Sequence, residues 1–321
     1  MWPELKYEQW RDSCQTLHRW MQIIGKVKLS KSPWLNHSWH STFFLTPRGL
    51  TSALIHDGPR AFAVDFDFVD HLLVIQDDRG AEVKLQLMPE SVASFYRKVF
   101  RAFDGMGIQA HIDPRPNELP DRERFSEDVI HCSYDPEFSS RFWQAMLRTH
   151  QVMQEFRSRY VGKVSPIHFF WGSMDLAITR FSGRRAPQHP GGVLNLPDLV
   201  TREAYSHEVS SCGFWPGNDL VPYPAFYSYA YPIPAGFESA RIRPNGAIYH
   251  ETLREFLLPY DLVRASADPA ATLLDFFQST YDAAANLGGW DRVSLEESPF
   301  LKLLQLSRAS SRRAGQLKKA G

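Results

Sequence analysis

The sequence has no excess of charge of either sign, because its 36 Lys and Arg residues balance its 36 Asp and Glu residues. A neutral chain has no general electrostatic attraction to nucleic acid or to an anionic membrane surface, so we expect neither as a partner. Cysteine is scarce as well, and Cys14, Cys132 and Cys212 lie far apart without a Cys-x-x-Cys pair. This pattern excludes a disulfide framework and suits a reducing cytoplasm.

Long apolar runs are also missing. The N-terminal segment MWPELKYEQWRD has neither the basic region nor the apolar region of a signal peptide. No window approaches the roughly 18 uninterrupted apolar residues of a membrane-spanning helix. We therefore expect a soluble, cytoplasmic protein. The one local charge bias is in residues 298–321, which contain Lys and Arg but no acid, and we expect a disordered basic tail there.

What the sequence does have is material for a large core. It contains 321 residues, of which 43% are hydrophobic and 13% aromatic. This length predicts two domains or one large one. We place the first unit at residues 1–112, a polar and Pro-rich connection at 113–127 and the second unit at 128–297.

The hydrophobic periodicity predicts the α+β class, with two tandem units that each contain an antiparallel sheet flanked by amphipathic helices. Apolar residues recur at helical spacing in four segments: 7–24, 91–104, 136–160 and 271–287. Strands are predicted where apolar residues alternate or run together, at 40–50, 62–69, 72–76, 82–87, 167–181, 203–214 and 225–231. Ser91 is a good N-cap for the second helix.

A weak internal repeat suggests that the two units arose by duplication. The tripeptide Gly-Lys-Val occurs at 25–27 and again at 162–164, each time after an amphipathic helix. Ser-Pro follows in both units, at 32–33 and at 165–166. Paired units of this kind often leave a ligand-binding cleft at their interface.

Several long and unusual motifs resemble one known family. They are GKVSPIHFFWGSMDLAITRFSGRRAPQHPGG, AYSHEVSSCGFWPG, SPWLNHSWH, TPRGL, FDFVDH and the N-terminal WPEL. Together they resemble the bacterial domain-of-unknown-function family 5996 over roughly residues 1–297. The resemblance implies a bacterial, cytoplasmic protein and brings no activity, cofactor or catalytic residue.

The segment 167–181 is the strongest candidate for a site. Read as one long strand, it places His168 with Leu176 and Arg180 on one face, and Trp171 with Asp175 on the other. Asp175 and its neighbouring hydroxyls suit the wall of a ligand pocket, although they could equally satisfy nearby backbone.

Three arginines, Arg180, Arg184 and Arg185, follow at the end of this strand. Guanidinium groups bind carboxylate or phosphate in a bidentate manner, which suggests an anchor for an anionic substrate. The alternative is a structural ion pair with Asp175, Glu203 or Glu208.

Histidines supply the candidate acid–base and metal chemistry. His168 and His207, with Glu208 or Asp175, could form an acid–base pair. His37 and His40 have the spacing of metal ligands on a helical turn, but they would point to opposite faces of a strand. The sequence leaves cofactors undetermined, and a divalent metal is an alternative that it does not favour.

Two functions remain open at this point. The first is an enzyme that acts on a small anionic molecule in a cleft between the units, with His168, His207, Glu208 and Asp175 in catalysis and the three arginines as anchor. The second is a non-catalytic binding protein for a small apolar or aromatic ligand, lined by Phe169, Trp171 and Tyr205. The oligomeric state and the reaction class do not follow from the sequence.

Overall fold

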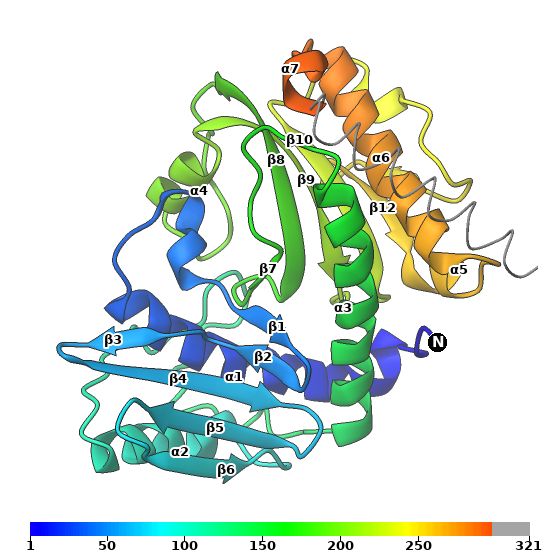
Figure 1. Cartoon of the computed structure of the whole chain (residues 1–321). Helices are drawn as coiled ribbons and strands as arrows, with labels where there is room; N and C mark the ends of the chain where they lie inside the picture. The colour runs from blue at the N-terminus through cyan, green and yellow to red at the C-terminus, as the bar shows by residue number, and fades with distance from the viewer. Residues whose placement is uncertain (297–321) are drawn as a thin grey trace, which may run out of the picture.

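The computed structural model describes residues 1–296, so the predicted basic tail at 298–321 lies outside the described residues. It contains two six-stranded sheets, each built only of antiparallel strand pairs, with helices packed against them (Figure 1). The α+β class is therefore confirmed. No helix within residues 1–296 combines the length and apolar character needed to cross a membrane.

The first unit begins with the helix α1 (Tyr7–Lys31), which is longer than predicted because its polar C-terminal turns are helical too. The 3-10 helix η1 (Asn36–Ser41) follows and includes His40 and Ser41, the first two residues of the strand predicted at 40–50. The strands of the first sheet are β1 (Phe44–Thr46), β2 (Gly49–Thr51), β3 (Ile55–Asp57), β4 (Arg60–Asp67), β5 (Leu72–Asp77) and β6 (Glu82–Gln86).

Alternation in β4 gives the first sheet its buried face, as predicted. Phe62, Val64, Phe66 and Phe68 are all at most 1% exposed. The unit closes with α2 (Val92–Gly105), whose first turn is capped by the Ser91 side chain accepting a hydrogen bond from the Ser94 amide. This cap is the one that the sequence predicts.

The second unit begins with α3 (Pro136–Arg157) and includes α6 (Pro269–Leu287), which cover one face of its sheet. The sheet order is β11-β12-β10-β9-β8-β7. Its strands are β7 (His168–Phe170), β8 (Asp175–Arg185), β9 (His207–Trp215), β10 (Ala225–Tyr231), β11 (Ile248–His250) and β12 (Glu255–Pro259). Short helices occupy the connections: α4 (Asp198–Ala204), η2 (Phe237–Ser239), α5 (Tyr260–Arg264) and α7 (Arg292–Glu296).

The prediction of one long strand over 167–181 is wrong. Residues 171–174 form a turn, so β7 and β8 are the arms of a hairpin in which His168 pairs with Ala177 and Phe170 with Asp175. Directly paired residues of adjacent strands share a face. His168 therefore lies on the same side of the sheet as Asp175, and not with Leu176 and Arg180 as a continuous strand would require.

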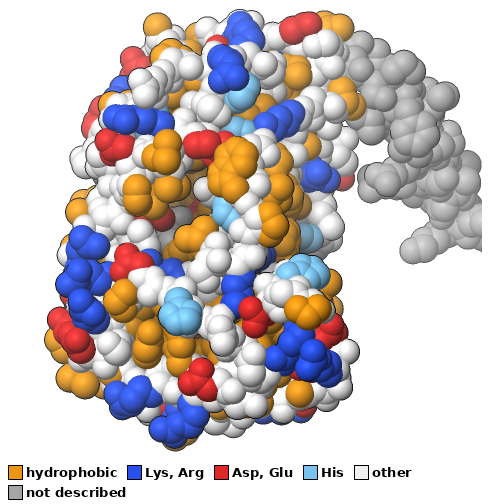
Figure 2. All heavy atoms as spheres, turned by 90° about the vertical axis from the view of Figure 1, so that its left-hand side faces the viewer, with side chains coloured by type: hydrophobic (Ala, Val, Ile, Leu, Met, Phe, Trp, Pro, Cys, Tyr) orange, Lys and Arg blue, Asp and Glu red, His pale blue; other side chains and the backbone are white. Residues whose placement is uncertain are grey.

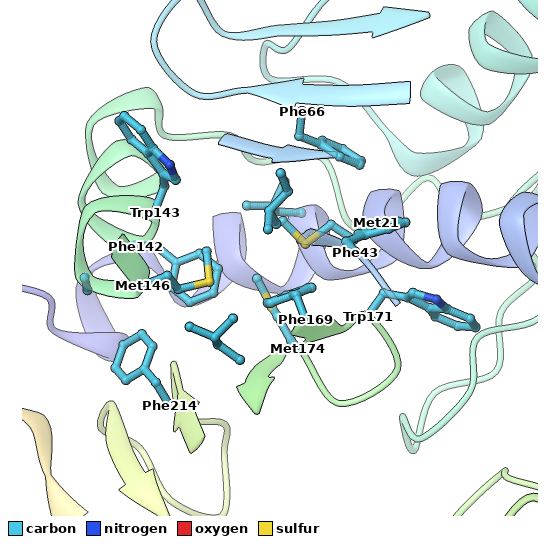
Figure 3. Close-up of a cluster of buried hydrophobic side chains, with 14 of the residues drawn as sticks. Met21, Phe43, Phe66, Phe142, Trp143, Met146, Phe169, Trp171, Met174 and Phe214 are labelled. Carbon is cyan, nitrogen blue, oxygen red and sulfur yellow. The ribbon is translucent and has the colours of Figure 1, made fainter. Parts of the chain in front are cut away.

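The two units share one hydrophobic core. Phe43 beside β1 and Phe169 of β7 exchange two backbone hydrogen bonds, at 2.9 and 2.8 Å, and so join the two sheets. Around this bridge, side chains from α1, α3 and both sheets pack together (Figure 3). The helix α3 also contacts the first sheet, where the indole of Trp143 donates to the Thr46 carbonyl at 3.2 Å.

The structure does not confirm the duplication. Residues 25–27 lie inside α1, whereas residues 162–164 lie in the loop between α3 and β7, so the two Gly-Lys-Val sequences occupy different environments. Both units nevertheless run from a helix through an antiparallel sheet to a second amphipathic helix. The shared ancestry of the units stays a prediction.

Candidate functional site

The second sheet has an outer face, the one turned away from α3 and α6, and this face carries an unusual set of polar side chains. Strand registers place Asp175, Tyr227 and Tyr229 on the outer face, with Gly213 and Ser211 between them on β9. Glu255 joins them from β12, two residues from Leu257, which pairs with Tyr227. Tyrosine and acidic side chains from three strands therefore lie on one surface.

Asp175 lies at the centre of this surface and is 7% exposed. Its carboxylate accepts hydrogen bonds from the hydroxyl groups of Ser173 and Tyr227. Burial raises the pKa of Asp175, and these two hydrogen bonds oppose the increase. The phenol of Tyr227 fits here because Gly213 has no side chain: a Cβ atom there would lie 2.4 Å from the Tyr227 hydroxyl oxygen.

Glu118 reaches the same surface from the segment that connects the two units. Its carboxyl lies against Gly172, where a Cβ atom would be 2.1 Å from Glu118 Oε1. The backbone of Glu118 is left-handed, with a φ of 59°. Such a conformation is costly for a residue with a side chain and is often found at functional sites.

The neighbours of Glu118 hold it in this position. The Asn117 amide donates to Gln22 Oε1 of α1 at 2.8 Å, and Gln22 Nε2 donates to the Asn117 carbonyl at 2.9 Å. On the other side, Asn195 Nδ2 donates to the Leu119 carbonyl at 2.6 Å. The connection at this point is therefore fixed to both units.

The pKa values of Glu118 and Glu255 are raised into the neutral range. Burial, and next the negative charge of Asp175, raise the pKa of Glu118 to about 7 and that of Glu255 to about 8. Neither carboxyl has a hydrogen-bond or ion-pair partner among residues 1–296. Both side chains still contact solvent in part, although protein surrounds them closely enough for burial to dominate their pKa values.

Tyrosines complete the surface. The hydroxyl of Tyr205, just after α4, donates to that of Tyr229 at 3.0 Å, and the rings of Tyr227 and Tyr229 stack with centroids 6.0 Å apart. Burial raises the pKa of Tyr229 to about 12 and those of Tyr205 and Tyr227 well above their ordinary value. We name the six residues of this surface the acid–tyrosine cluster: Glu118, Asp175, Tyr205, Tyr227, Tyr229 and Glu255.

Of the residues singled out from the sequence, only Asp175 and Tyr205 belong to the acid–tyrosine cluster. His168 shares the outer face but is 1% exposed, and its Nδ1 lies 3.1 Å from the Thr42 hydroxyl. Burial, followed by the charge of Lys28, lowers the pKa of His168 to about 3, so the imidazole is neutral. Its Nε2 has no hydrogen-bond partner in the described chain.

His37 and His207 come together at the end of the sheet, with ring centroids 6.0 Å apart. His37 is engaged by protein at both nitrogens, with Nε2 accepting from Lys163 at 2.7 Å and Nδ1 donating to the Ala204 carbonyl at 3.0 Å. His40 Nδ1 accepts from the Leu35 amide at 3.1 Å. Across residues 1–296, no three His, Cys, Asp or Glu side chains are placed to hold a metal ion.

The three arginines occupy separate environments and do not converge on an anion. Arg180 lies on the helix-covered face, 1% exposed, with its guanidinium carbon 3.5 Å from the Phe156 ring centroid and 4.3 Å from that of Tyr281. Arg184 pairs with Glu208 at 2.7 Å, which is the structural ion pair that the sequence allowed as an alternative. Arg185 is exposed and pairs across the strands with His207.

Alanine substitutions at these two exposed arginines are expected to have small effects. The Arg184 side chain is 50% exposed, so Arg184→Ala should reduce the free energy of unfolding by about 1 kcal/mol or less. Arg185→Ala should change it by less than about 0.5 kcal/mol. Urea unfolding of both variants tests this; a loss above about 3 kcal/mol for Arg184→Ala would show that the pair with Glu208 is a major structural element.

Trp171 and Phe169, the expected lining of an aromatic pocket, are core residues instead. Phe169 is fully buried beside Phe142 of α3. The indole of Trp171 packs on Gly25 of α1 and donates to the Ser41 carbonyl at 2.7 Å. Of the three expected lining residues, only Tyr205 reaches the outer face of the second sheet.

Sequence patterns do not single out Glu118 or Glu255. Glu118 lies in a segment whose polar, Pro-rich composition predicts a linker, and Glu255 is the first residue of the short apolar strand β12, a common place for a surface glutamate. The alternation of Tyr227, Tyr229 and Tyr231 predicts a strand with its tyrosines packed in the core, whereas the structure places Tyr227 and Tyr229 on the outer face. The side of the molecule bearing α4 and η1 shows interspersed acidic, basic, histidine and hydrophobic side chains (Figure 2).

Comparison with known proteins identifies the chain at the level of a family. Residues 2–297 match the model of a family described as "Family of unknown function (DUF5996)". The chain belongs to this family. No curated protein and no solved structure matches it. Membership in DUF5996 brings no assigned reaction, so the acid–tyrosine cluster has to be interpreted through its own chemistry.

Proposed function

We propose that this member of DUF5996 is an enzyme that acts on a small molecule at the acid–tyrosine cluster, with Glu118 and Glu255 as general acid–base groups. The observation that carries the proposal is the pair of closely surrounded, partly solvent-exposed carboxyls without a protein partner, whose pKa values are raised to about 7 and about 8. A catalytic acid or base works best when its pKa is near the working pH. Structural carboxylates usually have lowered pKa values instead, because cations or amides stabilise their charge.

Asp175 has a different role in this proposal. Ser173 and Tyr227 both donate to its carboxylate, which fixes its orientation and favours its charged form. Its charge in turn favours the protonated forms of Glu118 and Glu255. Neighbouring carboxyls whose environments separate their pKa values are a common arrangement for acid–base chemistry.

The structure does not support the predicted arginine anchor for an anionic substrate. Arg180 is on the opposite face of the sheet and Arg184 is paired with Glu208, so neither supports an anionic substrate at this cluster. The His168 and His207 side chains form no hydrogen bond or ion pair with Asp175 in the described structure. The proposal keeps an acid–base enzyme for a small molecule and replaces the histidines by glutamates.

A non-catalytic binding function is the second candidate, and the aromatic rings favour it. The imidazole of His189 stacks on Tyr205 with centroids 4.8 Å apart, and Tyr231 lies 5.2 Å from the same Tyr205 ring. Such a set of rings can hold an aromatic ligand without reaction. Turnover of a bound ligand distinguishes the two candidates.

Carbon-13 NMR of glutamate carboxyl groups tests the proposal directly. Two resonances should titrate near pH 7 and pH 8, the values for Glu118 and Glu255, while exposed glutamates titrate near about 4.3. Glu118→Gln and Glu255→Gln should each remove one of these two resonances. Asp175→Asn should keep both resonances and lower the pKa values of Glu118 and Glu255. Glu123→Gln, at an exposed position of the same connection, should leave both of these resonances in place. Titration of all glutamates below about 5.5 would contradict the proposal.

A further inference from the structure

The charges around the acid–tyrosine cluster are one-sided. No Lys or Arg forms an ion pair with Glu118, Asp175 or Glu255 among residues 1–296. The pKa of each of these carboxyls is raised chiefly by burial, and no cationic side chain opposes the increase. A surface that brings three carboxyls together without a positive partner favours a ligand that supplies the positive charge.

Neither glutamate carboxyl has a hydrogen-bond partner among residues 1–296, although protein surrounds both closely and each is only partly open to solvent. Leaving an enclosed carboxyl without a partner costs free energy, and such groups are rare unless a ligand or water completes them. The missing side chain of Gly172 makes room for the Glu118 carboxyl, and the strained backbone of Glu118 directs it there. These features are independent of the charge count and indicate an incomplete site.

The helix-covered face of the second sheet shows how aromatic rings of this protein surround a buried cation. There Arg180 is buried among the aromatic rings of Phe156, Tyr160 and Tyr281, with distances of 3.5 to 4.9 Å from its guanidinium carbon to the ring centroids. Aromatic faces stabilise a desolvated cation. On the outer face, Tyr205, Tyr227 and Tyr229 provide similar rings next to carboxyls, but no Lys or Arg of residues 1–296 forms an ion pair with those carboxyls.

We propose that the acid–tyrosine cluster binds a small organic cation, a primary or methylated amine, whose charged nitrogen lies among the carboxyls and tyrosine rings. This inference rests on the proposed function for the position of the site, and it names the substrate class. The described residues are not arranged to ligate a metal ion. An ammonium compound needs no close coordination sphere and uses phenol faces as well as carboxylates.

Cation binding at this site is coupled to proton release. Before binding, the protein favours the protonated forms of Glu118 and Glu255, and a bound cation favours their ionised forms. Affinity should therefore increase as the pH rises through about 7 and about 8, the pKa values of these groups. The other titratable groups that face the cluster are Asp175 on β8, Tyr227 and Tyr229 on β10, Tyr205 after α4, and His189, which stacks on Tyr205.

Three ligands of nearly the same shape separate charge from shape: benzylamine, which is cationic, benzyl alcohol, which is neutral, and benzoate, which is anionic. Isothermal titration calorimetry of the full chain near pH 6 and near pH 8.5, in buffers of different ionisation enthalpy, measures affinity and proton release together. We expect benzylamine to bind at least tenfold more tightly at the higher pH, with net proton release, and to bind more tightly than the other two.

Matched variants test whether benzylamine binds at the acid–tyrosine cluster. Glu118→Gln and Glu255→Gln should each weaken benzylamine binding by about tenfold or more, which corresponds to about 1.4 kcal/mol. Glu123→Gln and Glu251→Gln, which remove exposed carboxyls near each of them in sequence, should leave it unchanged. The circular dichroism spectrum and the unfolding midpoint of each variant show whether it is folded.

Two results would overturn the substrate class. One is equal binding of benzyl alcohol or benzoate; the other is no site-dependent binding of benzylamine up to about 10 mM, the range of very weak affinities. If the glutamate resonances still titrate near 7 and 8 in that case, the acid–base proposal stands and only the cationic ligand fails. If they titrate normally, the proposed function fails as well.

Discussion

Replacing Glu255 by Gln is expected to stabilise the protein at and above pH 8, by an amount on the order of 5 kcal/mol. The pKa of Glu255 is raised from 4.5 to about 8, because burial and then the charge of Asp175 disfavour its ionised form. Gln has nearly the same shape and carries no charge at any pH. The variant therefore avoids the cost that wild type incurs once Glu255 ionises.

The pH dependence follows from the direction of this change. Below pH 4.5 both the folded and the unfolded states hold the proton, and wild type and variant should have similar stability. Between pH 4.5 and about 8 the unfolded state has lost the proton while the folded state keeps it. Each such proton lowers the free energy of unfolding by about 1.4 kcal/mol for every unit of increasing pH. Above the folded-state pKa the loss is complete and the curve levels off.

Urea unfolding of wild type and Glu255→Gln at several pH values between about 4 and 9 measures this difference. The two curves should meet at low pH and separate steadily as the pH rises. Glu251→Gln, an exposed glutamate four residues earlier, serves as the control and should follow wild type throughout. A variant that is less stable than wild type at pH 8 would show that the charged form of Glu255 has a stabilising partner.

The second large effect is expected at Trp171, where the second unit packs on α1. Trp171→Ala should lower the free energy of unfolding by about 3 to 5 kcal/mol, the usual cost of removing a buried Trp. The indole is 7% exposed and covers Gly25, where a Cβ atom would lie 2.3 to 2.4 Å from three of its ring carbons. Calorimetric or urea unfolding of the variant gives the value.

A double variant shows whether this packing causes the loss. Gly25→Ala alone should destabilise the protein by about 1 to 3 kcal/mol through the clash with the indole. In the Trp171→Ala background the clash is gone, and the same change should be neutral or stabilising by up to about 1 kcal/mol, because Ala favours a helix over Gly. Purely additive effects would mean that the two residues do not contact each other in the folded protein.

Sequence patterns predicted the parts of the fold in which one side of an element is buried. The alternation of Phe62, Val64, Phe66 and Phe68 identified β4 and its buried face correctly. The alternation over Ala225–Tyr231 likewise identified β10. In β4 the period-two pattern follows the buried face, so it can be detected locally. In β10 the alternating tyrosines identify the strand but lie on its outer face.

The hairpin at residues 171–174 could not be predicted in this way. Its turn contains Met174 with a left-handed backbone, at a φ of 60°, and methionine gives no sequence signal for such a conformation. The turn is supported from α1, where the His18 imidazole donates to the carbonyls of Trp171 and Gly172 at 3.0 Å. Because this turn depends on a residue more than 150 positions away, the local hydrophobic periodicity cannot predict it.

The candidate site shows the same limit more strongly. Asp175 is predicted because it lies with neighbouring hydroxyl side chains on one face of the expected strand, and Tyr205 is predicted as a lining residue of an aromatic pocket. Glu118 and Glu255 differ from surface glutamates only in their tertiary surroundings, since burial and the nearness of Asp175 are what raise their pKa values. Sequence spacing does not report that nearness, because these three residues lie in three different segments of the chain.

The position of Glu118 means that neither unit can carry the acid–tyrosine cluster alone. A fragment of residues 128–296 would keep the sheet with Asp175 and Glu255, but it would lose Glu118 and the Gln22 side chain that anchors Asn117. A fragment of residues 1–127 would keep Glu118 and lose the surface that it faces. The ligand binding proposed for this chain should therefore require both units, and dividing the chain into separately expressed halves should abolish it.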